Sequence, residues 1–227
     1  PLVPGDQGYC VAMTDARAER TFVSTRGAET RGPLDAFDHL EVRGDDVVYI
    51  SGYSLADEAS RVALERLVGR LAQDRVGCRA LFDVSPMVGS VPLPALERIG
   101  ELEPIWSLNE RESGLLAARL GSVVEAGDHA STCEALSGLL GTVLVRAGER
   151  GSWFADGGSA TRTPSIPVTP VDTNGAGDAH SGVLAAALAR GMDLATALRW
   201  ANIAGALTTT HFGPATCPSE AEIRALV

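Results

Sequence analysis

The sequence contains no lysine, and all 19 of its basic residues are arginines. A Walker A phosphate-binding loop needs lysine followed by serine or threonine, so the absence of lysine excludes that class of nucleotide site. Schiff-base and pyridoxal phosphate enzymes are excluded as well, because both classes need a lysine amine.

Cysteine is scarce, and long apolar runs are absent. The 4 cysteines are spread along the chain and no two have CxxC spacing, so zinc and thiol-redox motifs are not supported. Reduced cysteines in a cytoplasmic protein are the simplest interpretation. No apolar run approaches membrane-spanning length. A net charge of −10 makes a phosphate-rich nucleic acid a poor partner.

The composition is that of a globular protein, with 45% hydrophobic and 21% charged residues over 227 positions. This length suits one domain, 1–227, with a sizeable core. Apolar runs typical of strands alternate with apolar residues at helical spacing, most clearly Leu64, Leu67, Val68 and Leu71. The alternation predicts βαβ units and a mostly parallel sheet.

The order of these patterns also predicts where a ligand binds. Strands are expected at 45–54, 79–86, 104–109 and 142–148, with shorter strands or extended loops at 152–158 and 161–168. Helices are expected at 110–121, 132–141, 177–190, from 194 to about 209, and after Ser219, and a hairpin at about 9–25 with its turn near Asp15 to Ala18. Asp83, Asn109, Gly148 and Asp172 each follow a predicted strand, which is the edge where parallel sheets bind ligands.

The stretch PVDTNGAGDAHSGVLAAALARG, residues 170–191, places glycines and aspartates before an apolar helix. The first N–H groups of a helix lack intrahelical partners, and Gly175, Ala176 and Gly177 would let an anion approach them closely. The alternative is an aspartate-rich cap that complements the helix dipole. A dinucleotide-binding fingerprint is excluded, because its third glycine would fall at His180.

Taken whole, DTNGAGDAHSG resembles the D-T-x-G-A-G-D signature of the ribokinase-like (pfkB-type) carbohydrate kinases. Other stretches match that family in order. SLNERES resembles its N-x-x-E motif, VRAGERG its T-x-G-x-x-G loop, WANIAGALTTTHFG its adenine-side helix and cation loop, and ERTFVSTRGAE its G-E-R-T…R-G-A-N segment.

The resemblance implies a doubly wound α/β fold, with a mostly parallel sheet flanked by helices. It also implies a small β lid over the sugar site, to which about 9–25 would contribute. Members of the family carry a first βαβ region with a G-G-x-x-N motif, and no such motif precedes GYC in this sequence. We therefore expect the N-terminal part of the fold to be missing from the chain. Some relatives dimerise through their lids, so the resemblance also implies a homodimer.

The family transfers the γ-phosphoryl group of ATP to an alcohol, usually a CH₂OH group. The resemblance therefore implies that this chain phosphorylates a small sugar or sugar acid in the cytoplasm. Asp178 would be the general base, and the backbone of Gly175, Ala176, Gly177 and Asp178 would form an anion hole. The alternatives are a nucleoside kinase of the same fold and a non-catalytic relative that senses a sugar or a nucleotide.

The same resemblance assigns the remaining roles. Asn109 and Glu112 would hold Mg²⁺ and phosphates, largely through water. Gly148 and Gly151 would border the nucleotide, and Asn202 would lie near the adenine. Three of these residues also have a purely structural interpretation: Asn109 as a helix N-cap, Glu112 as its capping-box partner, and Asn202 as a plain polar helix residue.

Two further positions match a monovalent cation site, which would hold K⁺. These are Asp172 and the Asn174 carbonyl, and the alternative for Asp172 is an Asx turn.

Four positions depart from the family pattern: Arg146 replaces threonine, His180 a common phenylalanine, Glu29 an asparagine, and Pro214 lies where Gly-Ala is usual. Arg146 would reach the ATP phosphates or point to solvent, and His180 would pack or lie on the substrate side.

Overall fold

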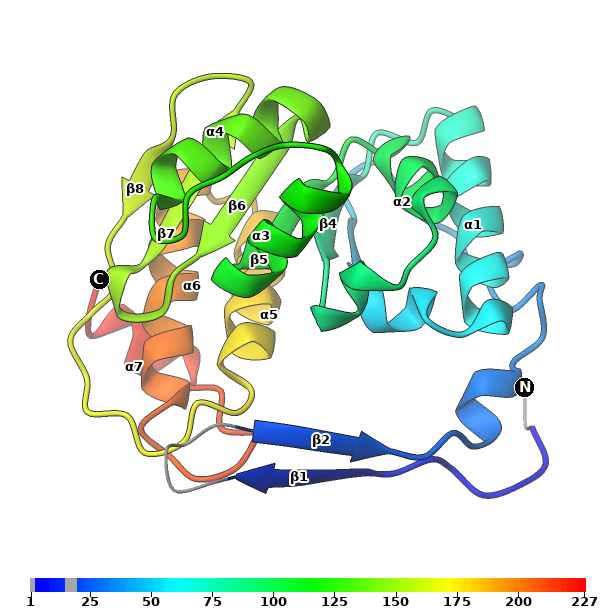
Figure 1. The fold of residues 1–227 in the computed structure, drawn as a ribbon, viewed down its shortest axis with the longest axis horizontal. Coiled ribbons are helices and arrows are strands. Elements are labelled where there is room, and N and C mark those ends of the chain that lie inside the picture. The colour runs from blue at the N-terminus through cyan, green and yellow to red at the C-terminus, as the bar shows by residue number, and fades with distance from the viewer. Residues whose placement is uncertain (1–2, 15–19) are drawn as a thin grey trace.

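Two sheets organise the chain in a computed structural model, which describes residues 3–14 and 20–227 (Figure 1). The smaller sheet is a hairpin of β1 (Cys10–Thr14) and β2 (Arg20–Ser24). The larger has six strands in chain order: β3 (Val47–Ser51), β4 (Arg79–Asp83), β5 (Ile105–Asn109), β6 (Thr142–Arg146), β7 (Ser152–Asp156) and β8 (Thr161–Thr163). The predicted turn near Asp15 to Ala18 lies outside the described residues.

The larger sheet is mostly parallel, as the sequence predicts. Strands β3 to β6 pair in parallel, β7 pairs antiparallel with β6, and β8 pairs antiparallel with β7. In the register, Ser51 pairs with Asp83, and Asn109 pairs with Arg146. The polar residues that end β4, β5 and β6 therefore lie along one edge of the sheet, where the strands have their carboxyl ends.

Helices cover both faces of this sheet (Figure 1). One face carries α1 (Glu58–Gln73), α2 (Leu93–Gly100), α3 (Glu110–Arg119) and α4 (His129–Leu140). The other carries α5 (Ala176–Ala189) and α6 (Leu194–Thr208), with α7 (Glu220–Arg224) against α6. Four 3₁₀ turns complete the described elements: η1 (Ala28–Arg31), η2 (Gly52–Leu55), η3 (Pro86–Gly89) and η4 (Gly148–Arg150).

Alternation along the strands divides the core into two layers. Phe82 and Trp106 face the α1–α4 layer, where their rings meet edge to face with centroids 5.1 Å apart. Leu81 and Leu144 face α5 and α6. All four side chains are buried, and each contributes about 1.5–3 kcal/mol through its apolar area. The two layers hold the carboxyl edge of the sheet as a firm base for a site.

The fold differs from the sequence predictions at two places. Helix α2 has no counterpart among the predicted helices, because Pro92 and Pro94 interrupt the chain where it begins. Both positions tolerate proline, since N–H groups of a first helical turn have no intrahelical partner. Asp172 was expected to follow a strand, but β8 ends at Thr163 and the chain from 164 to 175 contains no strand. Asp172 reaches the site on a loop.

The hairpin formed by β1 and β2 lies at the lower edge of Figure 1, on the side to which β6 points. Arg26, just after β2, forms an ion pair with Asp57 at 3.4 Å. The hairpin thus lies beside the edge of the sheet that the sequence analysis identifies as the ligand edge.

Glu29 fastens the base of the hairpin. Its carboxylate accepts hydrogen bonds from the backbone N–H groups of Gly8, at 2.7 Å, and Gly27, at 2.8 Å. These donors, Gly8 first and Gly27 second, hold the pKa of Glu29 below its ordinary value of 4.5. A glutamate replaces the family's asparagine here, and its charge strengthens both bonds.

We expect Glu29→Gln to loosen the base of the hairpin, visible as faster amide exchange at Gly8 and Gly27. Because the folded state lowers the pKa of Glu29, its contribution is complete above pH 4.5 and is lost as the pH falls through the lower folded-state value. Acidification should therefore lower the protection of these two amides, measured against the intrinsic exchange rate at each pH, in the native protein but not in the variant. Glu97→Gln, an exposed change on α2, is the control. Equal exchange in native protein and variant at neutral pH would contradict this role.

In the part of the chain that the structure describes, none of the helices combines the length and the apolarity needed to cross a membrane.

Candidate active site

The loop before α5 is closed against the loop after α6. Gly175 precedes the helix with φ +78°, a left-handed conformation that side chains rarely adopt. A Cβ atom at this position would collide with the backbone carbonyl of Pro214. Both the conformation and the close approach require glycine, and together they fix where α5 begins.

We expect Gly175→Ala to destabilise the protein by more than the usual cost of a left-handed residue, about 1–2 kcal/mol. Gly191→Ala is a matched control at the other end of α5, because Gly191 has φ +75° but open space around the added methyl group. Thermal unfolding of the two variants separates the collision with Pro214 from the conformational cost. Equal melting temperatures would show that the loop moves aside without cost.

The start of α5 is open. Four other helices begin at a residue whose side chain accepts a first-turn N–H group: Asn109 for α3, Asp128 for α4, Asp193 for α6 and Ser219 for α7. Gly175 provides no such cap for α5, and Asp57 of α1 and Pro92 of α2 provide none for their helices. The Ala176 N–H donates to the Thr173 carbonyl at 3.4 Å, and the next two residues, Gly177 and Asp178, are exposed. The first turn of α5 is therefore reachable from solvent at the positive end of the helix dipole, as an anion site needs.

The charge of Asp178 acts on two tyrosines of neighbouring elements, Tyr49 on β3 and Tyr53 on η2. Burial raises the pKa of Tyr49 to about 12, with further contributions from the charges of Asp83 and Asp178. Burial also raises the pKa of Tyr53, followed by the charges of Glu112, Asp178 and Asp83. The sequence did not indicate the two tyrosines as site residues, although both lie within the predicted strand 45–54.

Asn109 and Glu112 form a capping box at the start of α3. The Asn109 side chain accepts the N–H of Glu112 at 2.9 Å, and the Glu112 carboxylate accepts the N–H of Asn109 at 2.8 Å. The structural alternative for these residues is therefore present in the molecule. Glu112 is only 3% exposed, and burial raises its pKa against the opposing effects of the Asn109 N–H and Arg146.

Arg146 does not point to solvent; it lies among acids with 12% of its side chain exposed. Its Nη1 atom is 3.1 Å from Asp83 Oδ2, and its Nη2 atom is 3.5 Å from Glu112 Oε2. Nη1 also donates to the Gly177 carbonyl at 3.3 Å. Ser181, one turn after Gly177, donates to the same Asp83 oxygen at 2.8 Å. The sequence indicated Asp83 by its place after a strand but gave no signal for these pairings.

The glycine loop after β6 is a tight turn. Gly148 and Gly151 have φ +54° and +85°, and the Ala147 N–H donates to the Gly151 carbonyl at 2.8 Å. A Cβ at Gly151 would collide with the Thr163 carbonyl, whereas the space around Gly148 is open. The loop therefore leaves open backbone at Gly148, where a nucleotide was predicted.

Asn202 is buried in a polar network on α6. Its Nδ2 atom donates to Thr163 O at 2.9 Å and to Ser152 Oγ at 3.1 Å. Its Oδ1 atom lies 3.2 Å from His180 Nε2. Burial, aided by the charge of Arg146, lowers the pKa of His180 to about 3, so the ring is neutral. Both N–H donors of Asn202 are thus used within the protein.

Asp172 forms the predicted Asx turn. Its Oδ1 atom accepts the Asn174 N–H at 2.9 Å, and its Oδ2 atom accepts the Gly213 N–H at 3.1 Å. These bonds join the loop before α5 to the loop after α6. The Asx-turn alternative is therefore present, and the loops that the resemblance gives to a monovalent cation lie side by side.

Among residues 3–14 and 20–227, no three His, Cys, Asp or Glu side chains gather in a way that would hold a metal ion. Magnesium keeps several waters and needs few direct ligands. The capping box uses one hydrogen bond to each side chain, so oxygen lone pairs of Asn109 and Glu112 remain for such waters. The donor set fits water-mediated Mg²⁺.

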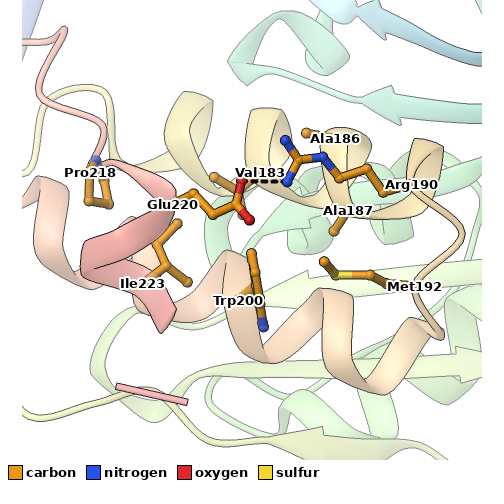
Figure 2. A pocket seen from close by; sticks show the side chains of 9 residues that line it. All are labelled: Val183, Ala186, Ala187, Arg190, Met192, Trp200, Pro218, Glu220 and Ile223. Carbon is orange, nitrogen blue, oxygen red and sulfur yellow. Dashed lines mark hydrogen bonds and ion pairs between the residues drawn. The ribbon is translucent and has the colours of Figure 1, made fainter. Parts of the chain in front are cut away.

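A separate hollow of about 150 Å³ lies between α5, α6 and α7 (Figure 2). Its lining is mostly apolar, with an ion pair between Arg190 and Glu220 at 2.5 Å along one side. The hollow contains none of the predicted site residues.

A six-stranded, mostly parallel sheet covered by helices on both faces, with a separate hairpin, is the ribokinase-like α/β fold. The chain belongs to the pfkB family of carbohydrate kinases, whose model matches residues 4–221. The sequence prediction of this family is therefore confirmed.

Individual relatives agree with this assignment. The uncharacterized sugar kinase YegV of Escherichia coli (strain K12) is 29% identical over 219 residues, covering 96% of this chain and 66% of that protein. The ribokinase of Bacillus subtilis (strain 168) is 36% identical over 105 residues, covering 46% of this chain and 32% of that protein. The chain spans less than two thirds of the length of these curated relatives.

Solved structures share the fold at low identity. A fructokinase from Vibrio cholerae O395, bound to fructose, ADP and calcium, has a TM-score of 0.77 at 22% identity, covering 99% of this chain and 74% of that one. A nucleoside kinase from Burkholderia thailandensis, bound to inosine, has a TM-score of 0.73 at 21% identity, covering 96% and 66%.

Proposed function

We propose that the protein is an ATP-dependent phosphotransferase that moves the γ-phosphoryl group to an alcohol, in most cases CH₂OH, of a small sugar or sugar acid. The observation that carries this proposal is the start of α5. It combines a first helical turn that is exposed at Gly177 and Asp178 with an N-cap residue, Gly175, that provides no capping side chain. Membership of the pfkB family supports the same reaction class.

In this proposal Asp178 is the general base. It takes the proton of the acceptor hydroxyl as that oxygen attacks phosphorus. The N–H groups of Ala176, Gly177 and Asp178 donate to the phosphoryl oxygens in the transition state, where negative charge faces the positive end of α5. The Gly175 turn holds these donors in place before the substrate arrives.

The nucleotide and its ions occupy the adjoining loops. Asn109 and Glu112 hold Mg²⁺ through water, and the metal offsets phosphate charge when bound. Gly148 and Gly151 border the nucleotide, and Asn202 orders the 163–164 segment on the adenine side. Asp172 and the Asn174 carbonyl are the proposed ligands of K⁺. The hairpin serves as the lid over the sugar.

A nucleoside kinase is the alternative acceptor class, because a nucleoside kinase shares this fold. The same Asp178 and α5 turn would act on a ribose hydroxyl. A sensing protein without catalysis is less well supported. Binding alone does not require a carboxylate beside an open helix start.

The deciding experiment is a coupled ADP-production screen on full-length protein, with pentoses, hexoses, sugar acids and nucleosides as acceptors. ADP formation with one of the first three groups supports the sugar kinase. Activity confined to nucleosides supports the alternative. No acceptor-dependent ADP, together with measurable binding of ADP or a sugar by calorimetry, would favour the sensing protein.

We also propose that the protein acts as one kinase unit in the cytoplasm, where ATP is available and its four free cysteines stay reduced. A homodimer through the hairpin fits its surface, because the cross-strand pair Val11 and Val23 is 48% and 53% exposed. Light scattering of native protein and Val11→Asp tests this: a native monomer would end the dimer proposal.

A further inference from the structure

Two positions that depart from the family pattern, Arg146 and His180, are both connected to the start of α5: Arg146 binds the Gly177 carbonyl, and His180 belongs to the helix itself. Gly177 and His180 are three residues apart and share one side of the helix. Arg146 binds the Gly177 carbonyl on that side, and its charge acts on the His180 ring. His180 is 5% exposed. Where the family pattern has a threonine and a phenylalanine, this chain has a cation and a polar ring.

Arg146 joins three elements through one guanidinium. Its contacts are Asp83 at the end of β4, Glu112 in α3 and the Gly177 carbonyl in α5. A planar guanidinium presents its donors in a fixed fork, so these contacts set the position of one element relative to the others. The carbonyl that Arg146 binds belongs to the turn that carries Asp178.

His180 makes the connection on the other side. Asn202 uses its Nδ2 atom for Thr163 O and Ser152 Oγ, so its Oδ1 atom must accept from His180. The network therefore assigns the hydrogen of the neutral ring to Nε2 and leaves Nδ1 as an acceptor. Among the described residues, His180 Nδ1 has no hydrogen-bond partner, and neither does the donor Arg146 Nε; both are buried.

We propose that Arg146 and His180 act as one coupled positioning pair. Arg146 sets the catalytic turn of α5 against the acids Asp83 and Glu112, and His180 joins that turn through Asn202 to the nucleotide-side segment 163–164. Both side chains keep one buried polar atom without a partner among the described residues, and both connect to the same turn of α5. This inference rests on the proposed function for the role of the turn, but the coupling itself is a property of the fold.

The test is a double-mutant cycle of Arg146→Thr, His180→Phe and the double variant, which together install the family residues. With the acceptor found in the screen, each single variant should lower kcat by about 10- to 100-fold, because a misplaced catalytic turn loses alignment. KM for the acceptor should change by less than about twofold. The double variant should be no worse than the poorer single variant, because the pair acts as a unit.

Amide exchange of the peptide 175–181 gives a readout that needs no substrate. Exchange should be about tenfold faster in each single variant than in the native protein, because the start of α5 opens locally. In the double variant it should be no faster than in the faster of the two single variants. Arg98→Thr removes an exposed ion pair with Glu101 and is the matched control that leaves this peptide unchanged. If a variant does not fold, Arg146→Lys and His180→Gln replace it, with smaller effects in the same direction.

Three outcomes would overturn the pair. Multiplicative effects in the double variant would show two independent residues. Unchanged exchange at 175–181 in both single variants would remove the positioning role. A raised KM for ATP with unchanged kcat in Arg146→Thr would make Arg146 a direct nucleotide ligand instead. Native protein without kinase activity would defeat the proposed function, while the exchange experiment would still decide the coupling.

Discussion

Asp178→Asn is expected to reduce phosphoryl transfer by about 10²- to 10⁴-fold, the range that a positioned general base contributes. Asparagine keeps the size of the side chain and cannot accept a proton at neutral pH. Nucleotide binding should stay close to that of the native protein, because the N–H groups of the α5 turn and the Gly148 loop are unchanged. ADP production with the best acceptor and calorimetric binding of ADP measure the two effects separately.

The matched control for this prediction is Asp45→Asn. Asp45 is also exposed, but it precedes β3 and so lies at the amino edge of the sheet, away from the site. Both variants remove one negative charge, so general electrostatic effects cancel between them. Turnover by Asp178→Asn close to that of Asp45→Asn would end the assignment of Asp178 as the base. If Asp178→Asn lost both ADP binding and turnover, Asp178 would have a role in nucleotide binding instead.

Most of the fold follows from local patterns in the sequence. The spacing of Leu64, Leu67, Val68 and Leu71 predicts α1, and all four residues are buried. The glycine-rich stretch predicts a helix from Gly177 to Arg190, and α5 occupies Ala176–Ala189. Helix α2 was missed because its prolines are typical of loops, although they fit a first turn. Local patterns identify elements well where hydrophobic spacing is strong and fail where turn residues occupy helix starts.

The site was predictable only as a set of positions. Strand ends indicated Asp83 and Asn109, and the capping box follows from residues three apart in sequence. The bonds from Arg146 to Asp83 and Gly177 join residues far apart in the chain, so no spacing rule could give them. The same is true of the bond between His180 and Asn202. Arg146 contacts oxygens of three residues at once, and the planar fork of a guanidinium suits this better than the single ammonium group of a lysine.

Gly177→Val is expected to lower kcat by about 10²- to 10³-fold, the cost of disturbing one oxyanion donor. A Cβ at this position would lie 2.9 Å from Arg146 Nη1, so the guanidinium must shift. The remaining methyl groups would crowd the surface where the phosphoryl group approaches the N–H donors. Stability should not fall in parallel, because valine is a better helix former than glycine and Arg146 can yield at the tip of a flexible side chain.

Gly182→Val separates crowding of the anion site from general effects on the helix. Gly182 lies on the same helix, is exposed, and has no atom within 4 Å of an added Cβ. Both substitutions replace an exposed glycine of α5 by valine, so thermal unfolding of the two variants should be similar while kcat should differ by about 10²-fold or more. Equal kcat values would mean that the phosphoryl group does not pass over Gly177, and the anion hole would then have to lie elsewhere on the carboxyl edge. A lower melting temperature confined to Gly177→Val would instead show that the Arg146 guanidinium cannot move away from the added side chain without a cost in stability. Its contacts with Asp83 and Glu112 would then resist displacement more than the α5 turn does.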